Sequence, residues 1–265
     1  MPEGQVSHRN ALRMTDVLRD APVLHVQAGA QVAAQRIPER LSGDVFTSVD
    51  AVGKHHVVRF ASGRVLHSHL GMNGRWRLVA ADAPVPQSGL WLMIRTATHA
   101  VAQYNGPRLR LYEPGEPVPA LRTVGPDLLS PDADPGEIAA TAVARADASR
   151  PIGDTLLDQR LLSGLGNVYR AETLFLCGID PWRATGRISD DEARAIGTTG
   201  AKLLAAGVRQ PGPITTYSAT RPGSRERTWV YGRTGRPCRR CGTPIRAHGM
   251  GDANRTIFWC PICQT

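Results

Sequence analysis

The first 112 residues combine one amphipathic segment with a series of short apolar stretches. Residues 4–20 carry a ragged apolar stripe, which predicts a helix. Residues 61–64 are a turn sequence that predicts a hairpin. The apolar stretches of this region are 23–26, 45–46, 56–60, 65–66, 76–79, 90–94 and 101–102. Short strands at this spacing predict an antiparallel β-sandwich or barrel.

The rest of the chain has a helical pattern with turns and a cysteine-rich end. Residues 113–136 contain six prolines and predict a linker. Apolar periodicity predicts helices at 154–162 and 168–177, and the capping-box sequence Ser189-Asp190-Asp191-Glu192 opens a third helix that reaches about residue 206. We therefore expect an α+β protein, whose four parts are a β-sandwich domain at 1–112 that begins with the helix, a linker at 113–136, a helical domain at 137–236 and a cysteine unit at 237–265.

Composition excludes a membrane span and points to an anionic partner. No run of about 18 apolar residues occurs, and the N-terminus lacks the apolar region of a secretory signal. The net charge of +9 lies entirely in residues 201–265, where 11 basic and 2 acidic side chains leave 11 − 2 = 9. Such asymmetry is typical of a nucleic-acid-binding protein, although charge alone also allows a solvated basic surface.

Two Cys-x-x-Cys pairs near the C-terminus predict one structural zinc ion per chain. Cys238 and Cys241 are separated by 18 residues from Cys260 and Cys263, the spacing of a Cys₄ site. Residues 256–259 predict a strand, so the unit is expected to be a β-hairpin ribbon with Arg255 near its tip. A redox dithiol is the alternative for the cysteines, and an ordinary exposed turn residue is the alternative for Arg255.

The N-terminus offers a candidate nucleophile. If Met1 is removed, Pro2 carries a free secondary amine beside the carboxyl group of Glu3. An α-amino group has a pKa of about 7.7–8.0, so an appreciable fraction is unprotonated at neutral pH. Attack on C1′ of a deoxyribose would expel the base and leave a covalent adduct, with protonated Glu3 assisting ring opening. Lys54 stands out as one of only two lysines among 32 basic residues.

A glycine-rich turn precedes the second predicted helix. Ser163-Gly164-Leu165-Gly166-Asn167 could grip a phosphate through backbone N–H groups and the Asn167 amide. The alternative is a tight turn between two helices with no ligand.

These pieces together resemble the formamidopyrimidine-DNA glycosylase and endonuclease VIII family of base-excision repair enzymes. The resemblance covers nearly the whole chain. Its motifs are Met1-Pro2-Glu3-Gly4, Val52-Gly53-Lys54, His67 to Gly74, Val124-Gly125-Pro126-Asp127, Leu156 to Gln159, Gly164 to Tyr169, Tyr231-Gly232-Arg233 and the cysteine unit. The resemblance implies a bifunctional DNA glycosylase and abasic-site lyase whose helix-two-turns-helix and zinc ribbon bind damaged duplex or single-stranded DNA. It also implies a monomer in the bacterial cytoplasm, associated with the nucleoid.

The resemblance assigns roles to individual residues. Pro2 would form the Schiff base, Glu3 would be the acid, and Lys54 would donate a proton or bind phosphate. The DNA contacts would be Arg255 at the lesion phosphates, where it would assist δ-elimination, Asn167 at a backbone phosphate, Met72 in the vacated base stack and Arg108 facing the orphaned base. A core methionine is the alternative for Met72, and a plain surface arginine is the alternative for Arg108.

Departures from the family pattern favour the endonuclease VIII branch, which excises oxidised pyrimidines. Val6 replaces a common acidic residue, Arg110 replaces an aromatic wedge, and the predicted loop at 208–236 is short for the formamidopyrimidine branch. Thr123 stands where endonuclease VIII carries an arginine, with Arg122 adjacent. The alternatives are an 8-oxoguanine and formamidopyrimidine glycosylase with the same chemistry, or a zinc protein that binds damaged DNA without catalysis.

Overall fold

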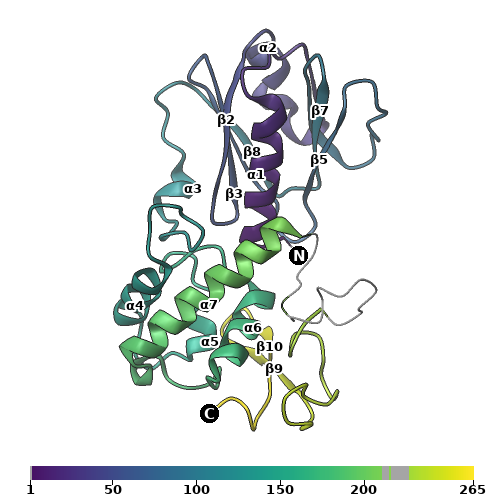
Figure 1. Ribbon diagram of the computed structural model, residues 1–265. Helices are drawn as coiled ribbons and strands as arrows, with labels where there is room; N and C mark the ends of the chain where they lie inside the picture. The colour runs from purple at the N-terminus through teal and green to yellow at the C-terminus, as the bar shows by residue number, and fades with distance from the viewer. Residues whose placement is uncertain (1, 211–214, 216–226) are drawn as a thin grey trace. The chain divides into compact units, whose positions relative to one another are not determined.

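The computed structural model describes residues 2–210, 215 and 227–265. They belong to two compact units, Met1–Arg122 and Thr123–Thr265 (Figure 1). The boundary falls inside the proline-rich segment 113–136. Residues 123–136 therefore belong to the C-terminal unit, whereas the proline pattern predicts that they are part of a linker.

The N-terminal unit is a sandwich of two four-stranded antiparallel sheets, as the sequence predicts. One sheet has the order β2-β3-β4-β8, formed by Phe46–Val52, His55–Phe60, Val65–His69 and Arg108–Tyr112. The other has the order β1-β6-β7-β5, formed by His25–Ala28, Leu90–Arg95, His99–Tyr104 and Arg75–Ala80. The hairpin predicted at residues 61–64 joins β3 to β4 and is confirmed.

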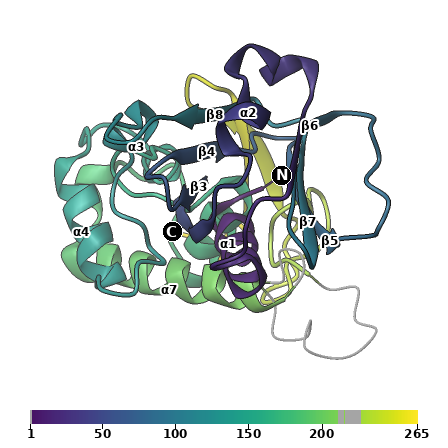
Figure 2. The ribbon, with the colours of Figure 1, turned by 90° about the horizontal axis from the view of Figure 1, so that it is seen from above.

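Helical segments close the sandwich along its open sides. The predicted N-terminal helix is α1, Gly4–Leu18, which contacts β2 and β3 of one sheet and β7 of the other (Figure 2). The 3₁₀ helix η1, Ala30–Gln35, contacts β8 of one sheet and both β1 and β6 of the other. Two short helices, α2 at Ile37–Leu41 and α3 at Pro119–Arg122, complete the unit. Apolar side chains of α1 share one core with the inner faces of both sheets. Because the sheets supply most of this core, a few apolar residues on α1 are enough to bury the helix.

The C-terminal unit is helical and ends in a β-hairpin. Its helices are α4 (Pro135–Arg145), α5 (Ile152–Thr155), α6 (Asn167–Cys177), η2 (Thr185–Arg187) and α7 (Asp190–Arg209), followed by β9 (Arg246–Met250) and β10 (Arg255–Trp259). The capping box is present, with the Ser189 hydroxyl accepting from the Glu192 N–H and the Glu192 carboxylate accepting from the Ser189 N–H. α7 packs on α4 at Gly197, where a Cβ would lie 1.9 Å from the Pro135 carbonyl oxygen.

The predicted helix at 154–162 is wrong. Helical geometry ends at Thr155, and successive turns lead to the start of α6. Polar side chains hold these turns, because Gln159 donates to the Leu157 and Leu165 carbonyls, and Asp158 accepts from the Arg160 N–H. Such local bonds compete with the helical ladder, and periodicity alone does not reveal them.

The basic loop predicted at 208–236 lies largely outside the described residues. α7 continues to Arg209, three residues beyond its predicted end, and residues 211–214 and 216–226 are not described. None of the helices in the described part of the chain is both long and apolar enough to cross a membrane.

Candidate functional site

The topology of the N-terminal unit carries Lys54 toward the end at which α1 begins. The Thr15 hydroxyl donates to the Val49 carbonyl at 2.8 Å, and the Asn10 amide lies 3.3 Å from His56 Nε2. The α1 and β2 segments therefore run in opposite directions, and the β2–β3 turn lies beyond Asn10 toward the helix start. Lys54 sits half-buried in that turn, after Gly53 with its positive φ of 56°.

Strand register brings two more predicted site segments to the same end of the sheet. His69 pairs with His55 on one side and with Arg108 on the other. The Lys54 turn, the loop after His69 and the start of β8 are therefore neighbours. A Cβ at Gly74 would lie 2.9 Å from the Gly106 Cα, so the loop after His69 packs tightly on the segment before Arg108.

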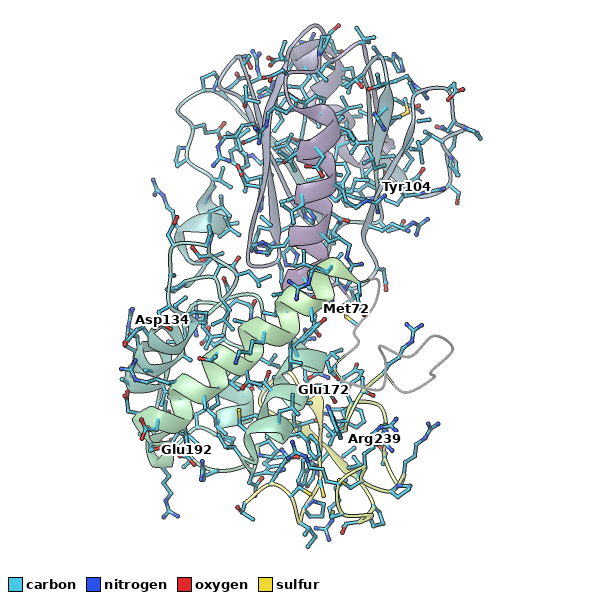
Figure 3. All side chains as sticks on the ribbon, viewed as in Figure 1. Met72, Tyr104, Asp134, Glu172, Glu192 and Arg239 are labelled. Carbon is cyan, nitrogen blue, oxygen red and sulfur yellow. The ribbon has the colours of Figure 1, made fainter. Side chains whose placement is uncertain are left out.

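Met72 is presented to solvent from this loop. Its side chain is 65% exposed, and Figure 3 places it at the end of the unit where α1 begins. Gly71, with φ of 58°, supplies the left-handed backbone that the turn requires. The alternative of a core methionine is wrong.

Glu3 is buried at the start of α1. Its side chain is 1% exposed, and its carbonyl oxygen accepts the Val6 N–H at 2.9 Å. Pro2 beside it is half-buried, and Met1 lies outside the described residues. A general acid of this kind must stay protonated near neutral pH, and shielding of its carboxyl group from water favours the protonated form.

Histidines that the sequence analysis gave no role accompany Lys54. Burial lowers the pKa of His69, and the charges of Lys54 and Arg108 lower it further. The pKa of His67 falls to about 4 and that of His55 to about 3, in both cases mainly through burial. The uncharged imidazoles therefore add no positive charge beside Lys54 at neutral pH. The signal in the sequence was the repetition of histidine at alternate strand positions.

Arg108 and Arg110 project from the strand at the sheet edge. Both are exposed, and a cavity of about 600 Å³ beside them is also lined by His67, Trp91 and Tyr112. The Arg110 guanidinium lies 4.8 Å from the centre of the Tyr112 ring and pairs with Glu116 at 3.0 Å. The replacement of an aromatic wedge by Arg110 thus leaves a cationic edge on this strand.

In the C-terminal unit, Asn167 begins α6 and its amide bonds to the hairpin. The Asn167 Nδ2 donates to the Thr256 carbonyl at 2.9 Å, and Oδ1 accepts from the Arg170 guanidinium at 2.7 Å. Gly164 in the preceding turn has φ of 103°, a conformation suited to glycine. The side chain expected to hold a phosphate therefore also fixes the hairpin to the helix start.

Arg170 is a site residue that the sequence analysis missed. It is completely buried, and its guanidinium donates to the Gly153 carbonyl at 2.8 Å, the Asn167 amide and the Arg255 carbonyl at 2.9 Å. One buried side chain thus links the side-chain amide of Asn167 to the backbone of Arg255, and both residues are predicted to bind DNA. The only sequence signal was an arginine within the apolar run of α6.

The Gly125-Pro126-Asp127 segment supports the turn before α6. The Gly125 N–H donates to the Gln159 carbonyl and the Ser163 N–H to the Pro126 carbonyl, both at 2.8 Å. A Cβ at Gly125 would lie 2.6 Å from the Arg160 carbonyl oxygen. This close approach explains why the motif contains glycine.

Arg255 is exposed at the first position of β10, directly after the hairpin tip. It pairs with Met250 in register and lines a cavity of about 300 Å³ together with Asp154 and Asp158. Both carboxylates are neutralised by other arginines, Asp154 by Arg150 at 2.6 Å and Asp158 by Arg160 at 2.7 Å. These arginine contacts lower the pKa of Asp158 to about 2, chiefly through the hydrogen bond from Arg160.

The four cysteines of the hairpin unit form one compact cluster of sulfur atoms. All four Sγ atoms lie within 4.8 Å of one another, with separations of 3.9 Å for Cys238–Cys263 and 3.5 Å for Cys241–Cys260. Thiolates in a tetrahedral zinc site, at about 2.3 Å from the metal, stand about 3.8 Å apart. The residues therefore fit a single metal ion held by four sulfur ligands.

Glu172 attaches the segment just before the cysteine unit to α6, and the sequence analysis missed this residue as well. Its side chain is completely buried and accepts the backbone N–H groups of Trp229, Val230 and Tyr231 at 2.7, 2.9 and 2.8 Å (Figure 3). The Arg240 guanidinium lies 4.4 Å from the centre of the Phe175 ring, also on α6. The orientation of the hairpin is thus fixed by buried polar groups of α6 as well as by the cysteines.

Comparison with known proteins gives matches over the whole chain. Residues 1–112 match the formamidopyrimidine-DNA glycosylase N-terminal domain, and residues 124–218 match the formamidopyrimidine-DNA glycosylase H2TH domain. The "Probable endonuclease 8 2" of Streptomyces coelicolor is 37% identical over 100% of this chain and 94% of its own. The "DNA-(apurinic or apyrimidinic site) lyase Nei2" of Mycolicibacterium smegmatis is 35% identical over 100% of this chain and 99% of its own.

A solved structure shares the fold throughout. The formamidopyrimidine-DNA glycosylase of Lactococcus lactis, crystallised with DNA containing an abasic site, superposes with a TM-score of 0.80. The match covers 100% of both chains at 22% sequence identity. Both the sheet sandwich and the helical unit with its hairpin thus belong to an established architecture.

Proposed function

The chain belongs to the formamidopyrimidine-DNA glycosylase family, and we propose that it excises oxidised bases from DNA and then cleaves the strand at the resulting abasic site. The observation that carries this proposal is the convergence of predicted catalytic segments at one end of the N-terminal unit. Buried Glu3 opens α1 there, and the Lys54 turn, the Met72 loop and Arg108 meet at the adjoining end of the sheet.

The proposed reaction begins at the amino terminus. After removal of Met1, the secondary amine of Pro2 attacks C1′, and the C1′–N bond to the damaged base breaks. Protonated Glu3 assists opening of the sugar ring, which leaves an iminium between Pro2 and C1′. Loss of a C2′ proton then expels the 3′ phosphate by β-elimination, and δ-elimination expels the 5′ phosphate. Lys54 acts as a proton donor or phosphate contact during these steps.

DNA is held by residues from both units. Met72 fills the stack that the extruded nucleotide leaves, and its exposure on a glycine-flanked turn supports this role. Arg108 faces the orphaned base, while Arg255 binds the lesion phosphates and assists δ-elimination. Asn167 contacts a further phosphate at the start of α6, where backbone N–H groups favour anions.

The cysteine cluster holds one structural zinc ion. Four thiolates leave no open coordination position, so the ion would stabilise the hairpin and take no part in the chemistry. The backbone N–H of Arg240 donates to the Cys238 sulfur at 3.4 Å, a contact that favours a thiolate ligand. In this assignment residues 1–112 are the catalytic domain, 113–136 the linker, 137–236 the helix-two-turns-helix domain and 237–265 the zinc ribbon.

Oxidised pyrimidines are the proposed substrates. The endonuclease 8 names of the relatives and the presence of Val6 and Arg110 support this branch. The alternative is 8-oxoguanine and formamidopyrimidine specificity with the same machinery. We place the protein in the bacterial cytoplasm, at the nucleoid, as a monomer.

Borohydride trapping on an abasic-site oligonucleotide tests the enzyme assignment. Wild-type protein should form a covalent adduct that Pro2→Gly abolishes, and absence of the adduct in wild type would leave a DNA-binding protein without catalysis. Excision assays with thymine glycol, dihydrouracil and 8-oxoguanine opposite each base then separate the two branches. Faster release of 8-oxoguanine than of either pyrimidine would reject the proposed specificity.

A further inference from the structure

Three imidazoles lie together on one face of the β2-β3-β4-β8 sheet. His55 on β3 is directly opposite His69 on β4, and His67 lies two residues before His69, so all three side chains project from the same face. The strand beside β4 places Arg108 opposite His69 on that face. The histidine side chains therefore follow the Lys54 turn along this face of the sheet.

The three rings form a continuous chain of contacts. His55 Nδ1 and His67 Nε2 are 2.8 Å apart, a hydrogen-bond distance at which one of the two nitrogens carries the proton. Their rings are stacked, with centres 5.0 Å apart and planes inclined by 18°. The His55 ring also contacts His69, with centres 4.8 Å apart and planes inclined by 51°. His55 therefore packs against both histidines of β4 and restricts the position of each ring.

His69 joins this chain to the Met72 loop. Its Nδ1 accepts the Gly71 N–H at 3.2 Å, so in the neutral ring the hydrogen resides on Nε2. The tautomer of His69 is thus set by the first turn of the loop that carries Met72. The adjacent Lys54 charge lowers the pKa of the same ring.

Burial, together with the positive charges nearby, keeps the three rings uncharged near neutral pH. The groups that act on these rings are Lys54, Arg108 and the fourth imidazole, His56, in addition to the three rings themselves. Burial is the largest cause of the lowered pKa in each case, and the neighbouring groups named here add to it as positive charges. Each ring therefore offers one N–H donor and one acceptor nitrogen.

We propose that His55 and His67 are positioning residues that hold the His69 ring in one orientation beside Lys54, in which its Nδ1 keeps accepting the Gly71 N–H and its tautomer stays fixed. This proposal rests on the proposed function, because it gives Lys54 its part in strand cleavage. When the His69 ring is fixed and uncharged, the Lys54 ammonium is the proton donor at this end of the sheet. A ring free to rotate into water would take up a proton near pH 6.5 and place a second charge beside Lys54.

The direct test is NMR of the full-length protein labelled with ¹⁵N in its histidines. In wild type the His69 signals should show the Nε2–H tautomer, and the pKa of the ring should lie below the ordinary value of 6.5. In His55→Ala, which opens the ring to water, the pKa of His69 should rise toward that ordinary value. A wild-type His69 that shows a mixture of tautomers, or a pKa that is not lowered, overturns the proposal without any variant.

Single-turnover cleavage of abasic-site DNA gives a second readout. His67→Leu removes the bond to His55 and should slow cleavage about tenfold, the size expected when a buried polar partner is lost. His67→Gln retains a polar group near the Nε2 position and should recover most of the rate. In the pH profile of His55→Ala, the ionisation of His69 should lie at higher pH than in wild type.

A matched control is available on the other sheet. His25 is exposed on β1, and His25→Gln should cleave at the wild-type rate. Folded His55→Ala and His67→Leu proteins, checked by circular dichroism, that keep wild-type His69 signals and rates would contradict the positioning role. Failure of the wild type to cleave abasic DNA would instead reject the proposed function, while the NMR result would still decide the positioning of His69.

Discussion

At the residue scale, the buried guanidinium of Arg170 is the link between helix and hairpin. It satisfies two backbone carbonyls and the Asn167 amide while remaining completely buried. Removing one partner of such an arrangement leaves buried acceptors without donors, which costs more than the net value of the bonds. The position of Arg255 therefore depends on a residue that we do not expect to touch DNA.

Arg170→Met should lower the free energy of unfolding by about 2–4 kcal/mol, because two buried acceptors and the part-buried Arg255 carbonyl lose their donor. It should also weaken binding to abasic-site DNA, since the hairpin carrying Arg255 is held to α6 by fewer bonds. Urea denaturation followed by circular dichroism and fluorescence anisotropy measure the two effects. Arg187→Met, at an exposed position of η2, is the control. Equal stability and affinity in the two variants would contradict the role of Arg170.

Side-chain networks of this kind could not be predicted from the sequence. Glu172 and Arg170 follow a helical pattern that is mostly apolar, and their partners lie 57–59 and 85 residues away along the chain. Local pattern carries no information on such distant pairs. Cysteine spacing, by contrast, predicted its cluster correctly, because two residues of each pair are neighbours in sequence and the tetrahedral geometry dictates the rest.

At the scale of elements, the cysteine hairpin should depend on its metal ion. Cys260→Ser removes one of four thiolates, and the zinc content should fall from one ion per chain to nearly none. The hairpin should then unfold locally, since structural zinc supplies much of the folding energy of such units. Metal analysis and DNA-binding anisotropy report both consequences.

Cys177 provides the matched control for that change. It is half-buried at the end of α6, outside the cysteine cluster. Cys177→Ser should keep both the zinc ion and the affinity for DNA. Retention of zinc and of DNA affinity in Cys260→Ser would show that the cluster has no structural role.

The histidines of β3 and β4 should make stability fall on mild acidification. Burial lowers the pKa of His55 and His56 to about 3 and that of His67 to about 4, below the ordinary value of 6.5. Below pH 6.5 the unfolded chain binds protons that the folded chain does not, so stability is lost as pH falls toward 4. Each histidine contributes at most about 1.4 kcal/mol per pH unit.

Urea denaturation at several pH values between 6.5 and 5 measures this slope, above the range in which ordinary carboxylates titrate. His56→Gln removes one buried imidazole. The dependence of stability on pH should then become less steep by the contribution of one histidine. An unchanged slope in that variant, or a wild-type stability that rises toward pH 5, would contradict the assignment of uncharged buried histidines.

The elements themselves were predictable to different degrees. The 61–64 hairpin and the Ser189 capping box were correct, because turn and cap chemistry is local. The helix at 154–162 failed because Asp158 and Gln159 bond to nearby backbone groups and turn the chain. Strand order, which makes Lys54, Met72 and Arg108 neighbours, depends on pairing across the sheet and had to come from the structure or from family resemblance.

At the scale of the whole molecule, chemistry and DNA affinity are divided along the chain. The N-terminal unit contains the proposed nucleophile and acid, while the whole excess of positive charge belongs to residues 201–265 of the C-terminal unit. A polyanionic substrate can bind to both units, because its phosphates contact the basic residues and its damaged nucleotide enters the reaction site. One DNA substrate would therefore bind to two units of different character.

Mass-spectrometric mapping of the borohydride-trapped adduct would identify the amine that attacks the sugar. The peptide attached to abasic-site DNA should begin at Pro2, with the initiator methionine removed and the DNA on the proline nitrogen. The two lysines, Lys54 and Lys202, are the competing amines, and they fall in separate tryptic peptides. An adduct on either lysine, or active enzyme that retains Met1, would contradict the account, because an acylated proline nitrogen has no lone pair available for attack.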